Sequence, residues 1–279
     1  MTTATQYADG AAVGVTVSDH VAHVLLKGPG KGNALGPDFW REAPEVFGAI
    51  DADPAVRAVV LSGSGANFSY GLDLVAMTSE LAYALAAPAM AAERTRFLDQ
   101  ITMMQRAATS LLECRKPVIA SISGWCIGAG LDIACATDVR VCSAEAMFSA
   151  RAVRIGIVED MGSLQLLPAI VGEGAARELS FTGEDIGAAR AAELRLVNHV
   201  TGTPEAALQQ AFEIAVRIAA NPPLTVQGVK QVMNQRAHAA LRESLHYSAL
   251  WNAAFMQSRD FAEAVAAFAE KRQPKFEGR

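Results

Sequence analysis

Two glycine-rich segments follow strand-like sequences and lead into a carboxylate. The first, residues 62–74, reads "SGSGANFSYGLDL", and the second, residues 123–138, reads "SGWCIGAGLDIACATD". In the second segment, the small residues 128–130 stand directly before an apolar run that contains Asp132. Small side chains let another group approach the main chain closely. Both segments could therefore present backbone N–H groups to a ligand.

Two interpretations of these segments stay open. A triplet of small residues is typical of a tight turn. Alternatively, two N–H groups that converge on one oxygen form an oxyanion hole, which stabilises a developing enolate by about 3 kcal/mol per donor. A helix beginning after residue 130 would add the partial positive charge of its N-terminus. Asp132 then either caps that helix, which lowers its pKa, or lies in an apolar pocket, which raises it.

The elements around these segments alternate between strand and helix patterns, which is typical of an α/β fold. Strands are expected in 13–28, 56–63, 116–124 and 139–150, and helices in 37–53 and 131–138, with a long Ala-rich segment at 73–112. After about residue 173 the strand pattern ends. Amphipathic helices are expected in 203–223, 224–255 and 258–272.

This pattern predicts two regions: an α/β core over 1–200 and a helical C-terminal region over 201–279. The helical region could dock on the core or on another subunit. This region has more apolar residues than one small helix face would bury, which favours an oligomer. They include Leu245, Leu250, Trp251 and Phe255.

Composition excludes several classes of function. The formal net charge of −5 argues against a nucleic-acid partner, because an acidic surface repels phosphates. The four cysteines form no C-x-x-C pair, so no metal site is expected, and reduced buried thiols fit a cytoplasmic protein. We expect neither a signal peptide nor a membrane-spanning segment.

Together, several motifs resemble the crotonase superfamily, the enoyl-CoA hydratases and isomerases. They are "GANFSYGLDL", "KPVIASISGWCIGAGLDIACATDVRVCSAEAMFS" and "GIVEDMGSLQLLPAIVGEGAARELSFTGEDIGAARAAELRLVNHV". The resemblance spans nearly the whole chain. It implies a spiral of ββα units, a helical C-terminal region for trimerisation, and a homo-oligomer that is a trimer or hexamer. The ligand would be an acyl thioester of coenzyme A, which is part of the substrate, so no separate cofactor is expected.

By position, the resemblance assigns the two oxyanion-hole N–H groups to Leu72 and Ala129. It also implies a set of residues that bind the substrate or its coenzyme A moiety: Ala66, Asn67, Phe68, Tyr70, Gly71, Asp73, Gly128 and Lys271.

The resemblance also bears on the acid/base groups. Enoyl-CoA hydratases use two glutamates, whose positions correspond here to Asp132 and Ala152, and alanine transfers no proton. "GIVEDMGSLQLLP" resembles the dienoyl-CoA isomerases, which place a catalytic aspartate at Asp160. The alternative for Asp160 is an N-cap of the helix near Gly162. Glu159 is a second candidate or a solvated loop charge, and the latter is favoured.

These residues predict an acyl-CoA isomerase that shifts the double bonds of a (di)enoyl-CoA in fatty-acid metabolism, with Asp132 and Asp160 as catalytic carboxylates. One alternative is a hydratase that adds water to a 2-enoyl-CoA. A second is a non-catalytic member that binds acyl-CoA, which the alanine at position 152 would favour.

Overall fold

The computed structural model describes residues 5–85 and 89–279. Its strands are β1 (Thr5–Asp9), β2 (Val13–Ser18), β3 (Val21–Leu26), β4 (Ala58–Gly63), β5 (Val118–Ile122), β6 (Trp125–Ile127), β7 (Val139–Ser143), β8 (Met147–Ser149), β9 (Asp185–Gly187) and β10 (His199–Thr201). Its helices are α1 (Pro37–Ala52), α2 (Leu74–Glu80), α3 (Ala82–Leu85), α4 (Ala91–Glu113), α5 (Ala129–Cys135), α6 (Ser163–Val171), α7 (Glu173–Thr182), α8 (Ala188–Glu193), α9 (Pro204–Ala219), α10 (Pro223–Phe255) and α11 (Arg259–Glu270). Short helical turns occur at η1 (Pro29–Asn33) and η2 (Arg151–Ile155).

A seven-stranded sheet forms the centre of the molecule, in the order β1-β2-β3-β4-β5-β7-β10. The first three strands pair antiparallel, and the pairs from β3 to β10 are parallel. A second, three-stranded sheet joins β6, β8 and β9. The prediction of an α/β fold is therefore confirmed.

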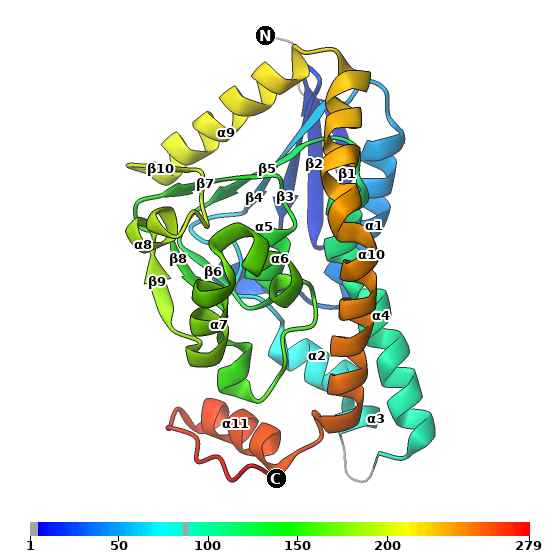
Figure 1. The fold of residues 1–279 in the computed structure, drawn as a ribbon, viewed down its shortest axis with the longest axis vertical. Coiled ribbons are helices and arrows are strands. Elements are labelled where there is room, and N and C mark those ends of the chain that lie inside the picture. Colours follow the sequence, from blue (N-terminus) through cyan, green and yellow to red (C-terminus); the bar gives the residue numbers. More distant parts are fainter. Residues whose placement is uncertain (1–4, 86–88) are drawn as a thin grey trace.

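The central sheet buries side chains on both faces because its strands alternate between two apolar cores. In β4, Val59 and Leu61 face the main core, while Ala58 and Val60 face a second core formed with α9. Such continuous apolar strands are expected where helices cover both faces of a parallel sheet. Figure 1 shows α9 on one side of the sheet, with α5 and α6 on the other.

The connections that follow β4 and β5 leave the same edge of the sheet. The two strands are parallel neighbours, with Ser62 beside Ser121 at their carboxyl ends. Residues 64–73 and 123–128 are therefore brought side by side. The second connection runs through β6 into α5, which is buried along its whole length.

Asn33 holds the first of these connections in place. Its buried side-chain amide donates to the carbonyl oxygens of Ser64, at 2.9 Å, and Asn67, at 2.7 Å. The carbonyl of Asn33 in turn accepts a hydrogen bond from the Ser69 hydroxyl at 2.9 Å. One buried asparagine thus orders the segment that leads to Gly71.

The C-terminal helices wrap one side and one end of the molecule. Figure 1 shows α10 running alongside α4, with α11 below it near α2. Helix α11 also packs against η2. The predicted boundary at residue 200 stays a prediction, although only helices follow β10. Within the described ranges, no helix combines the length and apolar character needed to cross a bilayer.

Four short strands differ from the sequence-based expectations. Neither β1 nor β6 is predicted, and β9 and β10 lie after residue 173, where the strand pattern ends. β9 and β10 have three residues each. Segments that short show too few alternations to reveal a period of two, and their pairing comes from the neighbouring strand.

We predict that Asn33→Gly lowers the free energy of unfolding by about 1–3 kcal/mol, because buried carbonyl groups lose their donor. Glycine keeps the left-handed backbone that Asn33 adopts (φ 46°), so the loss reports on the amide. Chemical denaturation measures it. Ser64→Ala, which removes a single hydroxyl donor to Asn33, is the control and should cost less. Equal stability of Asn33→Gly and the wild type would contradict this role.

Candidate active site

The N–H groups of Leu72 and Ala129 lie close together at the edge of the central sheet. A Cβ placed on Gly71 would lie 2.5 Å from the carbonyl oxygen of Ile127 and 3.1 Å from the nitrogen of Ala129. Ala129 is the first residue of α5, so its N–H has no acceptor within the helix. Among the described residues, neither N–H donates to a protein acceptor. Both donors are therefore available to a ligand oxygen.

The two segments touch through their main chains. The N–H of Ser69 donates to the carbonyl of Trp125 at 2.9 Å, and the N–H of Ile127 donates to the carbonyl of Ser69 at 3.1 Å. A Cβ on Gly130 would lie 2.8 Å from the Cβ of Ser69. Gly128 has φ +51°, a conformation that favours glycine. The small residues are therefore required by close packing as well as by the turn.

Asp132 is buried and does not cap its own helix. Its Oδ1 accepts a hydrogen bond of 2.5 Å from the N–H of Ser163, the first residue of α6. Burial raises its pKa to about 6, although the contacts with Ser163 act in the opposite direction. The capping alternative is thus wrong for α5, and Asp132 instead joins α5 to α6.

Asp160 is buried beside α10. Its Oδ2 accepts a hydrogen bond of 2.7 Å from the amide of Asn252, and its carbonyl accepts one of 2.7 Å from the amide of Gln105. Burial raises its pKa to about 7, while the Asn252 hydrogen bond favours the ionised form. Its side chain does not cap α6, whose N-cap is Gly162 without a side-chain bond. The N-cap alternative for Asp160 is therefore wrong.

Glu159 is buried, so the favoured interpretation of a solvated loop charge is wrong. Its side chain turns inward, where Oε2 accepts a hydrogen bond of 3.0 Å from the Ser163 hydroxyl. Burial raises its pKa to about 8, and the negative charges of Asp132 and Asp160 raise it further. The sequence has no periodic pattern here that could predict the inward orientation of Glu159, because residues 156–162 lie between regular elements.

Three carboxyl groups thus share one buried site. Ser163 links two of them, because its N–H bonds Asp132 and its hydroxyl bonds Glu159. Burial sets their pKa values near neutrality and apart from one another, at about 6, 7 and 8. Carboxyl groups with such values can exchange protons with a substrate at neutral pH.

Three of the predicted binding residues have structural roles. The Oδ1 of Asn67 accepts the N–H of Trp125 at 3.0 Å, Phe68 is fully buried in the core, and Asp73 caps α2 through the N–H of Ala76. These side chains shape the connection between β4 and α2. They are not free to contact a ligand in this arrangement.

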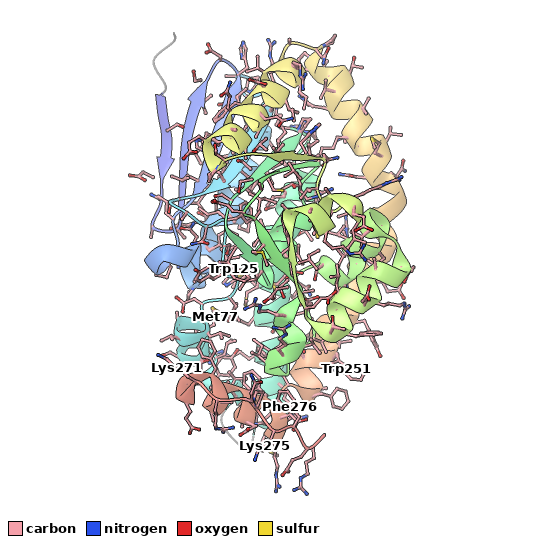
Figure 2. All side chains as sticks on the ribbon, turned by 90° about the vertical axis from the view of Figure 1, so that its left-hand side faces the viewer. Met77, Trp125, Trp251, Lys271, Lys275 and Phe276 are labelled. Carbon is pink, nitrogen blue, oxygen red and sulfur yellow. The ribbon has the colours of Figure 1, made fainter. Side chains whose placement is uncertain are left out.

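The other predicted binding residues lie at the surface or at the paired N–H groups. Ala66 and Tyr70 are exposed, and Gly71 and Gly128 flank the N–H pair. Lys271 is exposed at the end of α11, where Figure 2 shows it on the side of the molecule that also carries Trp125 and Met77.

A groove of about 740 Å³ lies between α1, α4 and α10, away from the N–H pair. Its lining includes Leu245 of α10 and Gln105 of α4, whose amide holds the carbonyl of Asp160. Neither the three carboxyl groups nor Ala129 line it. The groove therefore reflects the packing of three helices and is separate from the carboxyl groups.

Sequence reasoning left out the partners of the carboxyl groups. Ser163 and Asn252 are the side chains that hold them, and Asn252 is 92 residues from Asp160 in the chain. One feature of the sequence could have indicated the role of Asn252: it lies among apolar residues of a helical segment. An amide buried there needs a polar partner.

Comparisons with known proteins identify the family of this chain. The family model "Enoyl-CoA hydratase/isomerase" matches residues 16–279. The chain is 38% identical over 256 residues to the peroxisomal Delta(3,5)-Delta(2,4)-dienoyl-CoA isomerase of Arabidopsis thaliana, covering 92% of each chain. It is 40% identical over 259 residues to the mitochondrial Delta(3,5)-Delta(2,4)-dienoyl-CoA isomerase of Mus musculus, covering 92% of this chain and 78% of the mouse protein.

A solved structure shows the same fold. An enoyl-CoA hydratase from Mycobacterium avium subsp. paratuberculosis K-10 superposes with a TM-score of 0.82 and 25% identity, covering 96% of this chain and all of the other. The predicted crotonase-like fold is thereby confirmed. The chain belongs to the enoyl-CoA hydratase/isomerase family, in its dienoyl-CoA isomerase branch.

Proposed function

We propose that this enzyme converts a 3,5-dienoyl-CoA into a 2,4-dienoyl-CoA. The observation that carries the proposal is a cluster of buried carboxyl groups together with two unoccupied main-chain donors. The N–H groups of Leu72 and Ala129 would bind the thioester oxygen, while Asp132 and Asp160 exchange protons with the acyl chain. The names of the isomerases described above support the same reaction.

The reaction requires two proton transfers. Ionised Asp160 breaks the C2–H bond and becomes protonated. The electron pair spreads over the thioester and the diene, and the charge on the thioester oxygen is stabilised by the two N–H donors. A protonated carboxyl then forms a C–H bond at C6, which leaves double bonds at C2 and C4. No metal, redox cofactor or water is consumed, and coenzyme A enters as part of the substrate.

Two alternatives differ in what they require. A hydratase would add water to a 2-enoyl-CoA with the same N–H pair and carboxyl groups. It is less well supported, because residue 152 is an alanine and supplies no carboxyl there. A non-catalytic acyl-CoA-binding protein would have no use for buried carboxyl groups whose pKa values lie near neutrality, because burying them costs stability.

Binding of the coenzyme A moiety is part of the proposal. Ala66 and Tyr70 lie at the exposed end of the connection after β4, where an adenine group could contact main-chain atoms. Lys271 supplies an exposed cation for the phosphates, whereas Arg272 is already paired with Glu263 and Glu270. A cytoplasmic location also stays a prediction.

We predict that Asp160→Asn lowers turnover of a 3,5-dienoyl-CoA by about 10²–10⁴-fold, because the amide keeps the shape but transfers no proton. Acyl-CoA affinity should stay within a few-fold of the wild type. Formation of the conjugated product, followed by ultraviolet absorbance, measures the rate. Asp19→Asn, at an exposed turn, is the matched control. Near wild-type turnover by Asp160→Asn would remove the proposed function.

We expect a bell-shaped dependence of kcat/KM on pH. The base must be ionised, so activity rises as pH passes the pKa values of Asp132, about 6, and Asp160, about 7. One carboxyl must keep its proton, so activity falls above the highest value in the cluster, about 8. Initial rates from about pH 5 to about pH 9 test this. A constant rate over that range would show that these groups do not carry the proton transfers.

We also propose that the protein is a homo-oligomer, a trimer or hexamer, in which α10 contacts a neighbouring subunit. Three exposed aromatic residues follow one face of this helix: Tyr247, Trp251 and Phe255. Their rings contact one another, with centroids 6.5 Å and 4.7 Å apart. Exposed aromatic patches of this kind commonly mark an interface. Leu245, expected in the same surface, is buried within the subunit.

Trp251→Glu is expected to weaken the oligomer, because a charge would be buried in the contact. Sedimentation velocity at micromolar concentration should show a shift towards the monomer. Leu224→Glu, at an exposed position near the start of α10, is the control and should leave the assembly unchanged. A wild-type protein that sediments as a monomer would overturn the proposal.

A further inference from the structure

We infer that Glu159 is the catalytic acid that returns the proton to the far end of the diene. This assignment rests on the proposed isomerisation and names the group that performs its second step. The inference comes from three features of the structure: the burial of Glu159, a carboxyl oxygen without a partner, and the position of this carboxyl beside Ala152 and the other two carboxyl groups.

The burial of Glu159 is unusual for a residue without a counter-ion. Its residue exposure is 6%, yet no basic side chain pairs with it among the described ion pairs. Oε2 is held by the Ser163 hydroxyl, whereas Oε1 is buried and has no hydrogen-bond partner among the residues that the structure describes. A buried polar atom left without a partner costs about 1–3 kcal/mol. Such a cost is expected where the free atom meets a substrate.

The carboxyl of Glu159 also lies near the main chain of Ala152, a residue whose own side chain has no carboxyl. The main-chain N–H of Ala152 is close enough to stabilise its charged form, and Ser163 holds it next to Asp132. Asp160, the adjacent residue, points its carboxyl to Asn252 on α10. The two neighbouring acids are thus fixed by different partners, so they can serve different atoms of one ligand.

Protonation distinguishes Glu159 from the two aspartates. Burial and the adjacent negative charges hold the pKa of Glu159 at about 8, above those of Asp132 and Asp160. At neutral pH it is therefore the carboxyl of the three that best retains a proton. The aspartate that removes the C2 proton must be ionised, which in turn favours the protonated form of Glu159 through their mutual repulsion.

The step balances without another reactant. The O–H bond of Glu159 breaks as a C–H bond forms at C6, and Glu159 is left as a carboxylate. The aspartate that took the C2 proton is then protonated. Transfer of that proton to Glu159 within the cluster, or exchange of both groups with water after product release, restores the starting state.

Deuterium exchange separates the two steps. In D₂O, Glu159→Gln should still exchange the C2 proton of a 3,5-dienoyl-CoA, because the N–H pair and the aspartates remain. Formation of the 2,4-dienoyl product should fall by about 10²–10⁴-fold. Mass spectrometry of recovered substrate measures the exchange, and ultraviolet absorbance measures the product. Retained exchange also shows that the variant is folded.

Ser163→Ala is the matched variant. It removes the hydroxyl bond to Glu159 but keeps the carboxyl and the N–H bond to Asp132, so product formation should fall less than about 10-fold. A loss as large as that of Glu159→Gln would mean that the hydroxyl contact matters rather than the acid, and would overturn the inference.

Two outcomes for Glu159→Gln would also overturn it: product formation near the wild-type rate, or loss of C2 exchange together with product formation. Failure of the proposed function is distinguishable, because then the wild-type protein itself would form no 2,4-dienoyl-CoA.

Discussion

The close approach of the main chain at Gly71 to the main chain at Ala129 is the contact on which the site depends. It follows from the parallel pairing of β4 and β5, which sends both connections off the same edge of the sheet. A side chain at residue 71 would collide with the carbonyl of Ile127. Within the described part of the chain, the same contact leaves two N–H groups without protein acceptors. Close packing and a pair of free N–H donors are thus consequences of one backbone arrangement.

The carboxyl cluster adds a cost that the fold must offset. Burial raises the pKa of each carboxyl above its ordinary value, so the folded state binds protons more tightly than the unfolded chain. The protonated carboxyl groups therefore add to the free energy of unfolding below about pH 4. That contribution is lost as pH rises through about 6 to 8, where the groups ionise in the folded protein. One pKa unit corresponds to about 1.4 kcal/mol. Ser163 and Asn252 reduce the cost by donating hydrogen bonds to the ionised forms.

The sequence predicted the parts of this structure that follow from periodicity and from short motifs. The strands β2 to β5, the helix α1 and the buried α5 are long or distinctive enough to be recognised, and the small residues near Ala129 indicated the close approach. The role of Asn33 and the inward orientation of Glu159 could not be predicted. Each depends on contacts between segments that are distant in the chain or irregular, where no repeating pattern carries information.

The alanine at residue 152 illustrates the same limit for function. Judged by position alone, it removes a carboxyl that the resemblance to enoyl-CoA hydratases implies at this position, which would favour loss of activity. In the folded chain, Glu159 places a carboxyl beside the main chain of Ala152, seven residues further along the sequence. Proton transfer requires an acid at a point in space, and more than one position in the chain can supply it. The proposed role of Glu159 therefore depends on where its carboxyl lies in the folded chain and not on its position in the sequence.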